Sequence, residues 1–328
     1  MTAMDPDRNK CFELRGKRVW VAGHTGLVGS AIVRRLARED CQLILVSHDE
    51  LDLIRQSDTE AFFERERPQV VFLAAALVGG ILANARFPAD FIYENLMIAA
   101  NVMRAAHLFG VRKLLWLGSS CVYPRDAPQP IPESALLTGP LEATNEAFAV
   151  AKIAGIKMAA AFQAQHDDRF ISAMPTNLYG PNDNFDLESA HVLPALVRKI
   201  HEAHVQKAPS VTIWGSGRPL REFLHVDDLA DACIFLVKHY EGRDPINVGT
   251  GREVSIRELA EIIADVVGYD GDFVFDQTRP DGTPRKLVET SKIAAMGWRP
   301  RISLETGIRE LYRDRLAARP AAASAWVN

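Results

Sequence analysis

The chain has 328 residues, 48% of them hydrophobic and 24% charged, so it can bury a large core as one α/β domain or as a domain with an added lobe. Its formal net charge of −4 excludes a global basic field that would draw it to nucleic acids or anionic membranes. Residues 1–17 hold no apolar core of about 7 to 15 residues, which predicts a cytoplasmic protein without a secretion signal or membrane anchor.

Cysteine and histidine spacing excludes two further classes. The four cysteines, Cys11, Cys41, Cys121 and Cys233, show no C-x-x-C pair, and no H-E-x-x-H motif occurs. We therefore expect reduced thiols and no metal site.

Short apolar runs alternate with amphipathic stretches through the first half of the chain. The predicted strands are residues 18–22, 43–46, 70–73, 113–117 and 170–174, and the predicted helices are residues 28–38, 59–67, 89–109 and 145–165. Each helix is long enough for the crossover that parallel strands require. The pattern predicts a doubly wound parallel sheet in an α/β fold.

A glycine-rich turn follows the first predicted strand and opens the first predicted helix. Its spacing is G-x-x-G-x-x-G, close to the G-x-G-x-x-G of dinucleotide-binding folds. Glycines permit a tight turn and close backbone approach, and helix N-terminal amides favour a pyrophosphate. The turn predicts a dinucleotide site at Gly23, Thr25, Gly26, Leu27, Val28 and Gly29; the alternative is a βα turn without a ligand.

The second predicted strand ends in Val46-Ser47-His48, without a carboxylate that would repel a 2′-phosphate. No arginine is present to hold that phosphate, so Ser47, His48 and Thr25 are the candidate donors. We predict NADP as cofactor, with NAD not excluded. Asp52 is predicted to face the adenine amino group; its alternative role is a helix N-cap.

A polar run, Gly118-Ser119-Ser120-Cys121, comes directly after the fourth predicted strand. Open parallel sheets bind ligands beyond the carboxyl ends of their strands, so we expect these hydroxyls to face a substrate. Downstream, Phe148 and Lys152 share one helix face through i, i+4 spacing, where a short-chain dehydrogenase has Tyr-x-x-x-Lys.

The pattern loosens after about residue 175, where Gly, Pro and Asn become frequent and the predicted helices are residues 192–203, 227–239 and 256–267. We predict a dinucleotide-binding domain over residues 1–175 and a smaller substrate lobe over residues 176–328. The chain is expected to return to the sheet near residues 223–225 and 246–248, within 222–250, so the two parts interleave.

Several segments together resemble the GDP-L-fucose synthase family of extended short-chain dehydrogenase/reductases, nearly end to end. The strongest are Ala74-Ala75-Ala76-x-Val78-Gly79-Gly80, Gly118-Ser119-Ser120-Cys121-x-Tyr123-Pro124, Met174-Pro175-Thr176-Asn177-Leu178-Tyr179-Gly180-Pro181, Arg221-Glu222-Phe223-Leu224-His225-Val226-Asp227-Asp228 and Pro280-Asp281-Gly282-Thr283-Pro284-Arg285-Lys286. The resemblance implies a Rossmann fold and a bifunctional 3,5-epimerase/4-reductase that uses NADPH on GDP-4-keto-6-deoxy-D-mannose.

By this resemblance, Cys121 and His191 are the acid–base pair of the epimerisation. A 4-keto group acidifies the hydrogens on C3 and C5, so a base on one face and an acid on the other can invert both centres through an enolate. From the residues alone, the simpler interpretation is a small buried thiol at Cys121 and a surface imidazole at a helix start at His191.

The resemblance assigns the proton of the reduction step to a tyrosine hydroxyl, supported by the charge of Lys152 and by Ser119 at the carbonyl. This chain has Phe148 there, which holds no proton, and losing a general acid typically costs about 10² to 10⁴ in rate. We therefore predict an impaired reductase. Two interpretations remain open: a tyrosine deliberately replaced to stall turnover, or a natural protein that acts mainly as an epimerase.

The resemblance also places the ligands and the partner. The expected substrate residues are Ser120, Asn177, Lys199, Trp214, Arg221 and Lys286, and the further cofactor residues are Lys152, Pro175, Asn177 and Leu178. Arg221 suits a diphosphate by its fork of donors, and Trp214 offers an apolar face. The expected partners are a GDP-sugar and a second copy, in a homodimer formed through helices 89–109 and 145–165, with no nucleic acid and no membrane.

Two alternative functions follow from Phe148. One is an epimerase that acts without reduction on a GDP-4-keto-6-deoxy sugar or a heptose. The other is a non-catalytic dinucleotide-sensing binding protein, although a sensor has no chemical need for Ser119, Cys121, Lys152 and His191. A 4,6-dehydratase is disfavoured because it should have an Asp-Glu pair at the position of Cys121.

Overall fold

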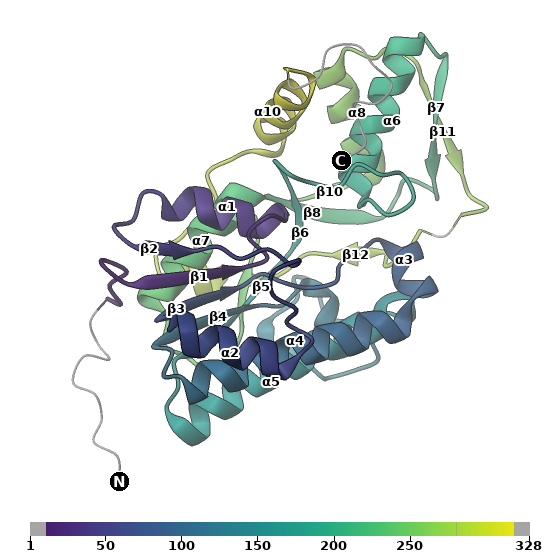
Figure 1. Ribbon diagram of the computed structural model, residues 1–328. Helices are drawn as coiled ribbons and strands as arrows, with labels where there is room; N and C mark the ends of the chain where they lie inside the picture. Colours follow the sequence, from purple (N-terminus) through teal and green to yellow (C-terminus); the bar gives the residue numbers. More distant parts are fainter. Residues whose placement is uncertain (1–10, 280, 318–328) are drawn as a thin grey trace.

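The computed structural model describes residues 11–279 and 281–317. Its larger lobe is built on a six-stranded sheet with the order β2-β1-β3-β4-β5-β9, paired in parallel throughout (Figure 1). These strands are β1 (Arg18–Ala22), β2 (Gln42–Ile44), β3 (Val70–Leu73), β4 (Lys113–Leu117), β5 (Phe170–Pro175) and β9 (Ile246–Val248). The predicted doubly wound parallel sheet is confirmed.

Helices cover both faces of this sheet (Figure 1). One face carries α1 (Leu27–Leu36) and α7 (Val226–His239), and the other carries α2 (Gln56–Glu66), α4 (Pro88–Leu108) and α5 (Glu146–His166). Side chains alternate along a strand, so Val19 and Val21 pack with α1 and α7 while Trp20 packs with α2 and α4. Burial on both faces explains the nearly continuous apolar runs of the strands.

Helix α5 is mostly apolar, with Lys152 and Lys157 as the charged residues of its middle part. The segment Ala143–His166, which contains it, is the one stretch of the described chain that is long and apolar enough to cross a membrane by length and composition. Gly155 lies against the Trp116 indole, where any side chain would collide, and α5 packs closely on α4 and β5. A helix packed inside a folded domain has this same composition.

The smaller lobe holds the remaining strands and three helices. Its sheet joins β6 (Asn177–Tyr179), β8 (Leu220–His225), β10 (Glu253–Ser255) and β12 (Arg285–Lys286), and β7 (Ser210–Trp214) pairs with β11 (Asp272–Asp276). Helices α6 (Val192–Gln206), α8 (Ile256–Val267) and α10 (Leu304–Ala317) pack around them. Short helices complete the chain: α3 (Ile81–Arg86), α9 (Ser291–Ala295), and the 3₁₀ turns η2 (Ser120–Val122), η3 (Glu133–Ala135) and η4 (Ala143–Asn145).

One predicted return to the main sheet is confirmed and the other is wrong. Residues 246–248 form β9 at its edge, as predicted. Residues 223–225 instead belong to β8, which pairs with β6, β10 and β12. The physical reason is that Phe223 packs into the core of the smaller lobe while Leu224 packs beneath the main sheet, so β8 bridges the two cores.

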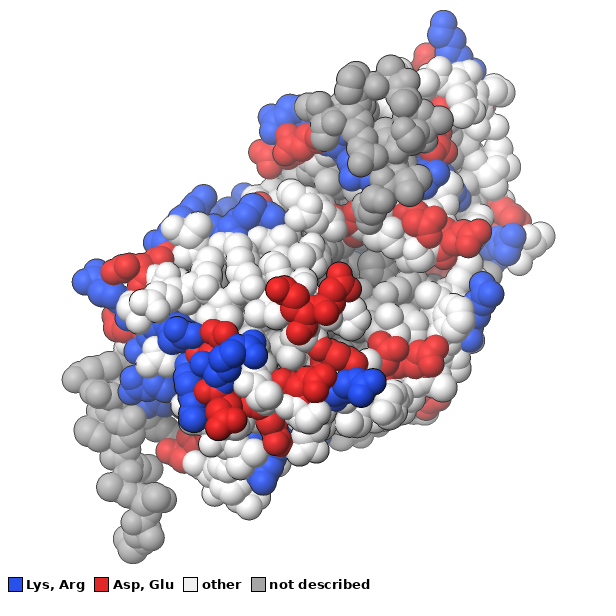
Figure 2. Space-filling view, in the orientation of Figure 1, with Lys and Arg blue, Asp and Glu red and all other residues white. Residues whose placement is uncertain are grey.

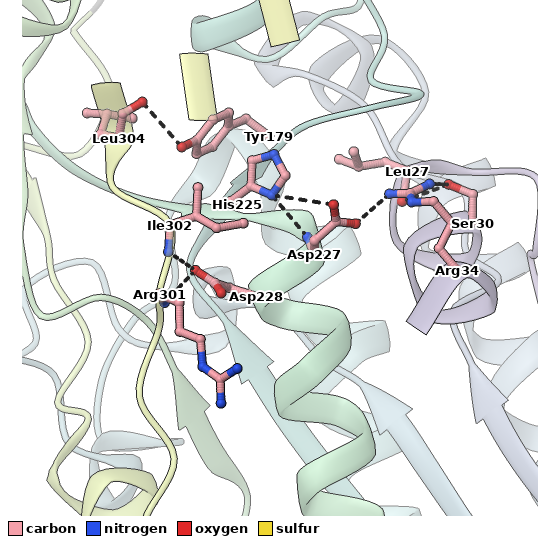
Figure 3. A network of polar contacts seen from close by, with 10 residues as sticks. All are labelled: Leu27, Ser30, Arg34, Tyr179, His225, Asp227, Asp228, Arg301, Ile302 and Leu304. Atoms are coloured by element: carbon pink, nitrogen blue, oxygen red, sulfur yellow. Dashed lines mark hydrogen bonds and ion pairs between the residues drawn. The ribbon is translucent and has the colours of Figure 1, made fainter. Parts of the chain in front are cut away.

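A polar network joins α1 to the start of α7 at this bridge (Figure 3). Arg34 of α1 pairs with Asp227 at 2.6 Å, and the Asp227 backbone N–H donates to Nδ1 of His225 at 3.2 Å. Asp228 accepts two backbone N–H bonds from the segment before α10. Burial lowers the pKa of His225, so the imidazole stays neutral and keeps Nδ1 as an acceptor. Residues 225–228 therefore connect α1, the helix that follows the glycine turn, to the smaller lobe.

Candidate active site

A cavity of about 810 Å³ lies between the two lobes. Figure 2 shows the opening between the lobes, with acidic side chains beside it. Every residue that the sequence predicts for cofactor, catalysis or substrate lines this one cavity. The strand ends of the main sheet supply one wall, and β6, β8, β12 and α6 supply the other. The structure thus brings all predicted site residues together.

The glycine turn is shaped by close backbone approach. Gly23 has φ +79°, and a Cβ there would lie 2.9 Å from the backbone of Ala75. A Cβ on Gly29 would collide with the Gly23 carbonyl oxygen, which brings the helix tightly onto the turn. Helix α1 begins directly after Gly26 and has no acidic residue in its first turn, so its positive end faces the cavity without a competing charge.

The adenosine end differs from the prediction at Ser47. Its N–H and O–H both donate to Oε2 of Glu50, at 3.0 and 2.8 Å, and these bonds lower the pKa of Glu50. Ser47 is therefore not a free donor for a 2′-phosphate, and a carboxylate lies where none was expected. The sequence did not indicate this carboxylate, because Glu50 lies several residues after the strand and its side chain folds back to Ser47.

Asp52 lines the cavity, as predicted. Its Oδ1 accepts the backbone N–H of Ile54 at 3.0 Å, and α2 begins only at Gln56 with Arg55 as its N-cap. Asp52 therefore does not cap the helix, and the alternative role that the sequence left open for it is wrong.

The polar run after β4 forms the 3₁₀ turn η2. The Ser119 hydroxyl accepts the backbone N–H of Cys121 at 3.4 Å, which turns the chain sharply at the strand end. Ser120 and Cys121 are 3% and 6% exposed, and Ser119 is half-buried. The turn thus presents two hydroxyls and one thiol to the cavity wall.

Lys152 and Phe148 lie one turn apart on α5, beside that thiol. The Lys152 ammonium donates to the Leu117 carbonyl at 2.9 Å and lies 4.2 Å from the Trp116 ring centroid. Burial lowers the pKa of Lys152 to about 8, and nearby Cys121 opposes the shift. The Phe148 ring centroid is 5.6 Å from the Lys152 Nζ, and the ring packs edge-on against Phe91.

His191 and Lys286 approach from the smaller lobe. His191 is the N-cap residue of α6 and lines the cavity. It is exposed, but the solvent that it meets is the solvent inside the cavity. Burial and then the charge of Lys286 lower the pKa of His191. Burial also lowers the pKa of Lys286, against the opposing effect of Cys121. Cys121 therefore lies within electrostatic reach of two lysines, one from each lobe.

The outer end of the cavity is cationic and aromatic. Trp214 is 43% exposed, and its ring lies 4.9 Å from both the Lys199 ammonium and the Arg279 guanidinium carbon. Burial lowers the pKa of Arg221, whereas Asp281 and Glu142 oppose the shift. Sequence reasoning missed Arg279, Asp281 and Glu142, of which only Asp281 lay in a segment that carried the resemblance.

Asn177 has one role fixed by its surroundings. Its Nδ2 donates to the Glu222 carbonyl at 2.8 Å, so its Oδ1 remains to accept a bond from a ligand. We thus expect Asn177 to contact a cofactor or substrate through this oxygen, which takes a donor on the ligand, or through the second hydrogen of Nδ2.

The loop that leads to His191 contains a buried carboxyl group, and removing its charge is expected to stabilise the protein. Asp183 is 3% exposed, and its Oδ2 has no partner within the described chain. Burial raises its pKa to about 7, so the folded state loses stability as the pH rises from about 4 to 7. We expect Asp183→Asn to increase the free energy of unfolding by about 2 kcal/mol more at pH 8 than at pH 5. Urea unfolding at both pH values measures this, and an effect independent of pH would contradict it.

All four cysteines are free, with Cys121 and Cys233 buried. Within residues 11–279 and 281–317, no group of three or more His, Cys, Asp or Glu side chains is placed to hold a metal ion.

Comparison with known proteins agrees with this geometry. The model of the NAD dependent epimerase/dehydratase family matches residues 19–249. The chain is 60% identical over 299 residues to "Putative GDP-L-fucose synthase 2" of Arabidopsis thaliana, covering 91% of each chain. It is 58% identical over 303 residues to "GDP-L-fucose synthase" of Sinorhizobium fredii, covering 92% of this chain and 96% of the other.

Solved structures give the same picture. "MlghC, GDP-mannoheptose C4 reductase from Campylobacter jejuni with NADP bound" is 37% identical with a TM-score of 0.83, covering 92% of this chain and 98% of the other. A "gdp-l-fucose synthetase from Naegleria fowleri bound to NADP" is 29% identical with a TM-score of 0.86, covering 94% and 97%.

Proposed function

The chain belongs to the NAD dependent epimerase/dehydratase family and, within it, to the GDP-L-fucose synthases, and from this membership we propose its reaction. It converts a GDP-4-keto-6-deoxy-hexose of the mannose type by epimerisation at C3 and C5, followed by NADPH-dependent reduction at C4. The observation that carries the proposal is the meeting of Cys121, Lys152, His191 and Lys286 in the cavity that also contains the glycine turn.

The epimerisation uses one group from each lobe. Cys121 comes from the turn after β4 and His191 from the start of α6, so a sugar between them is approached from two sides. One group removes the proton on the carbon next to the ketone, and the other returns a proton on the opposite face. The negative charge of the enolate oxygen is stabilised by the neighbouring ammonium groups and by Ser119.

The cofactor fits the glycine turn. A side chain on Gly23 or Gly29 would fill the space that the turn keeps narrow, and the positive end of α1 suits a pyrophosphate. When bound there, NADPH supplies the hydride for C4. We propose NADP because two similar structures are described as binding it. Glu50 opposes a 2′-phosphate only weakly, because its side chain is exposed and solvent screens its charge.

Reduction is the slow step in this chain. Lys152 and Ser119 are in place, but Phe148 offers no proton to the ketone oxygen at the position of the family's tyrosine. We propose that the epimerised 4-keto sugar accumulates ahead of the reduced product. Phe148 also supports the second candidate, an epimerase without reduction, whose sugar is a hexose or a heptose.

Deuterium exchange tests the proposed function. The protein is incubated with GDP-4-keto-6-deoxymannose in deuterated water, and NMR follows the C3 and C5 signals. We expect deuterium to enter both positions faster than in buffer, without any need for turnover of NADPH, because enolate formation precedes reduction. Exchange at the buffer rate would contradict the substrate assignment and would favour a non-catalytic binding protein.

We also propose a cytoplasmic homodimer that pairs through α4 and α5. Within one copy, 44% of the apolar window of α5 is buried, and Tyr93 of α4 is 57% exposed. A second copy laid against these helices would cover that apolar surface. Two of the relatives are named GDP-L-fucose synthases, and the synthesis of a GDP-sugar supports a cytoplasmic location.

A further inference from the structure

A fully buried carboxylate, Glu222, lies behind the substrate wall of the cavity. Its Oε1 accepts the backbone N–H groups of Thr250 and Gly251 at 2.6 and 2.8 Å, and also the Thr250 hydroxyl at 3.4 Å. Its Oε2 accepts the backbone N–H of Val288 at 3.1 Å. Three of these donors are backbone N–H groups, which favour the ionised carboxylate and so oppose burial, which raises the pKa of Glu222.

These bonds join the chain segments that carry two cationic side chains of the substrate site. Arg221 is the neighbour of Glu222 in β8, and Lys286 pairs with Arg221 in the register of β12. Val288 follows Lys286 by two residues, so its bond to Glu222 fixes the chain that carries Lys286. The Glu222 side chain itself lines no part of the cavity, whereas Arg221 and Lys286 do.

We propose that Glu222 is a positioning residue, which sets the spacing of Arg221 and Lys286 for the diphosphate of a sugar nucleotide. The inference rests on the proposed function, because it takes the anion to be that of a GDP-sugar. Glu222 is expected to affect the binding of the sugar nucleotide and not the binding of the dinucleotide cofactor. On the cofactor side, the Glu222 backbone carbonyl accepts from Thr176 and Asn177, and these two bonds are kept in any substitution. The Thr176 hydroxyl also acts on the carboxylate itself and lowers its pKa.

Whether Glu222→Gln tightens or weakens the binding of an anion distinguishes a positioning role from a purely electrostatic one. Glu222→Gln removes a negative charge near the diphosphate, so electrostatics alone would tighten the binding of an anion. Positioning predicts the reverse. The amide of glutamine keeps one acceptor for Thr250 and Gly251, but its NH₂ then faces the N–H of Val288, donor against donor. The segment of Lys286 must shift away.

A matched control lies directly across the strand pair. Glu253 of β10 pairs with Glu222 in the antiparallel register, and its carboxylate holds the exposed Arg285 at 2.7 to 3.0 Å. Glu253→Gln therefore removes the same charge from the same sheet without touching the bond to Val288. A half-exposed ion pair of this kind contributes little.

The experiment measures the dissociation constant of GDP by calorimetry and that of NADPH by fluorescence for both variants and the unaltered protein. We expect Glu222→Gln to weaken GDP binding by about tenfold or more, with NADPH binding and Glu253→Gln within about twofold of the unaltered protein. NADPH binding also shows that each variant is folded. Glu222→Asp, which keeps the charge but cannot span from Thr250 to Val288, is the second variant and is expected to weaken GDP binding as well.

Two results would overturn the inference. Unchanged or tighter GDP binding by a folded Glu222 variant would show that the residue serves stability alone. Equal weakening of GDP and NADPH would show general loosening of the lobe junction. If the unaltered protein binds NADPH but no GDP, the proposed GDP-sugar function is wrong, and the inference that rests on it is wrong too. This result differs from the two above, because it is seen without any substitution.

Discussion

Phe148→Tyr is expected to raise the rate of NADPH oxidation on GDP-4-keto-6-deoxymannose by about 10²-fold or more. The added hydroxyl extends from a ring that already lines the cavity, one helical turn from Lys152. The Lys152 ammonium, 5.6 Å from the ring centroid, favours the phenolate form and so lowers the pKa of the new phenol. The change adds one oxygen and leaves the contact with Phe91 in place. Loss of absorbance at 340 nm measures the rate.

The control for this gain is Lys152→Met in the Phe148→Tyr protein, which keeps the phenol but removes the charge beside it. We expect most of the gain to disappear. Deuterium exchange at C3 and C5 should stay within a few-fold in Phe148→Tyr, because enolate formation does not use this hydroxyl. If tyrosine leaves NADPH oxidation unchanged while exchange proceeds, the missing general acid is not what limits reduction, and the chain is an epimerase.

Much of the larger lobe could be predicted because its strands are buried on both faces. Val19 and Trp20 point to opposite helical layers and are both apolar, so the strand reads as a continuous hydrophobic run. The strands of the smaller lobe give no such signal. β8 carries Arg221 and Glu222 and packs Phe223 and Leu224 into different cores, so no periodicity in the letters reveals its partners.

The residues of the site could be predicted where they come soon after the end of a strand. Gly23 directly follows β1 and Ser119 lies two residues after β4, and parallel strands bring their carboxyl ends to one edge. Glu50 could not be predicted because it reaches back to Ser47, and Glu222 because its partners lie 28 to 66 residues away. Hydrogen bonds across such separations leave no spacing to recognise.

Cys121→Ser is expected to reduce deuterium entry at C3 and C5 by about 10² to 10⁴, the usual effect of removing an acid–base group. The substitution preserves size and a polar hydrogen, so the turn held by Ser119 should persist. It replaces a thiol with a hydroxyl, which gives up its proton far less readily. The new oxygen stays within electrostatic reach of Lys152 and Lys286 but cannot carry the proton away from carbon.

Cys41→Ser is the matched control, because it makes the same change at a half-buried thiol that lies just before β2 and does not line the cavity, and it should leave exchange unchanged. Combining Cys121→Ser with Phe148→Tyr separates the two half-reactions in one protein. If Cys121 acts in epimerisation alone, the double variant still oxidises NADPH, by reducing the unepimerised 4-keto sugar directly, and it yields a C4 alcohol with C3 and C5 unchanged. Loss of both activities would instead mean that Cys121 supports the site as a whole, and its assignment as an acid–base group would be wrong.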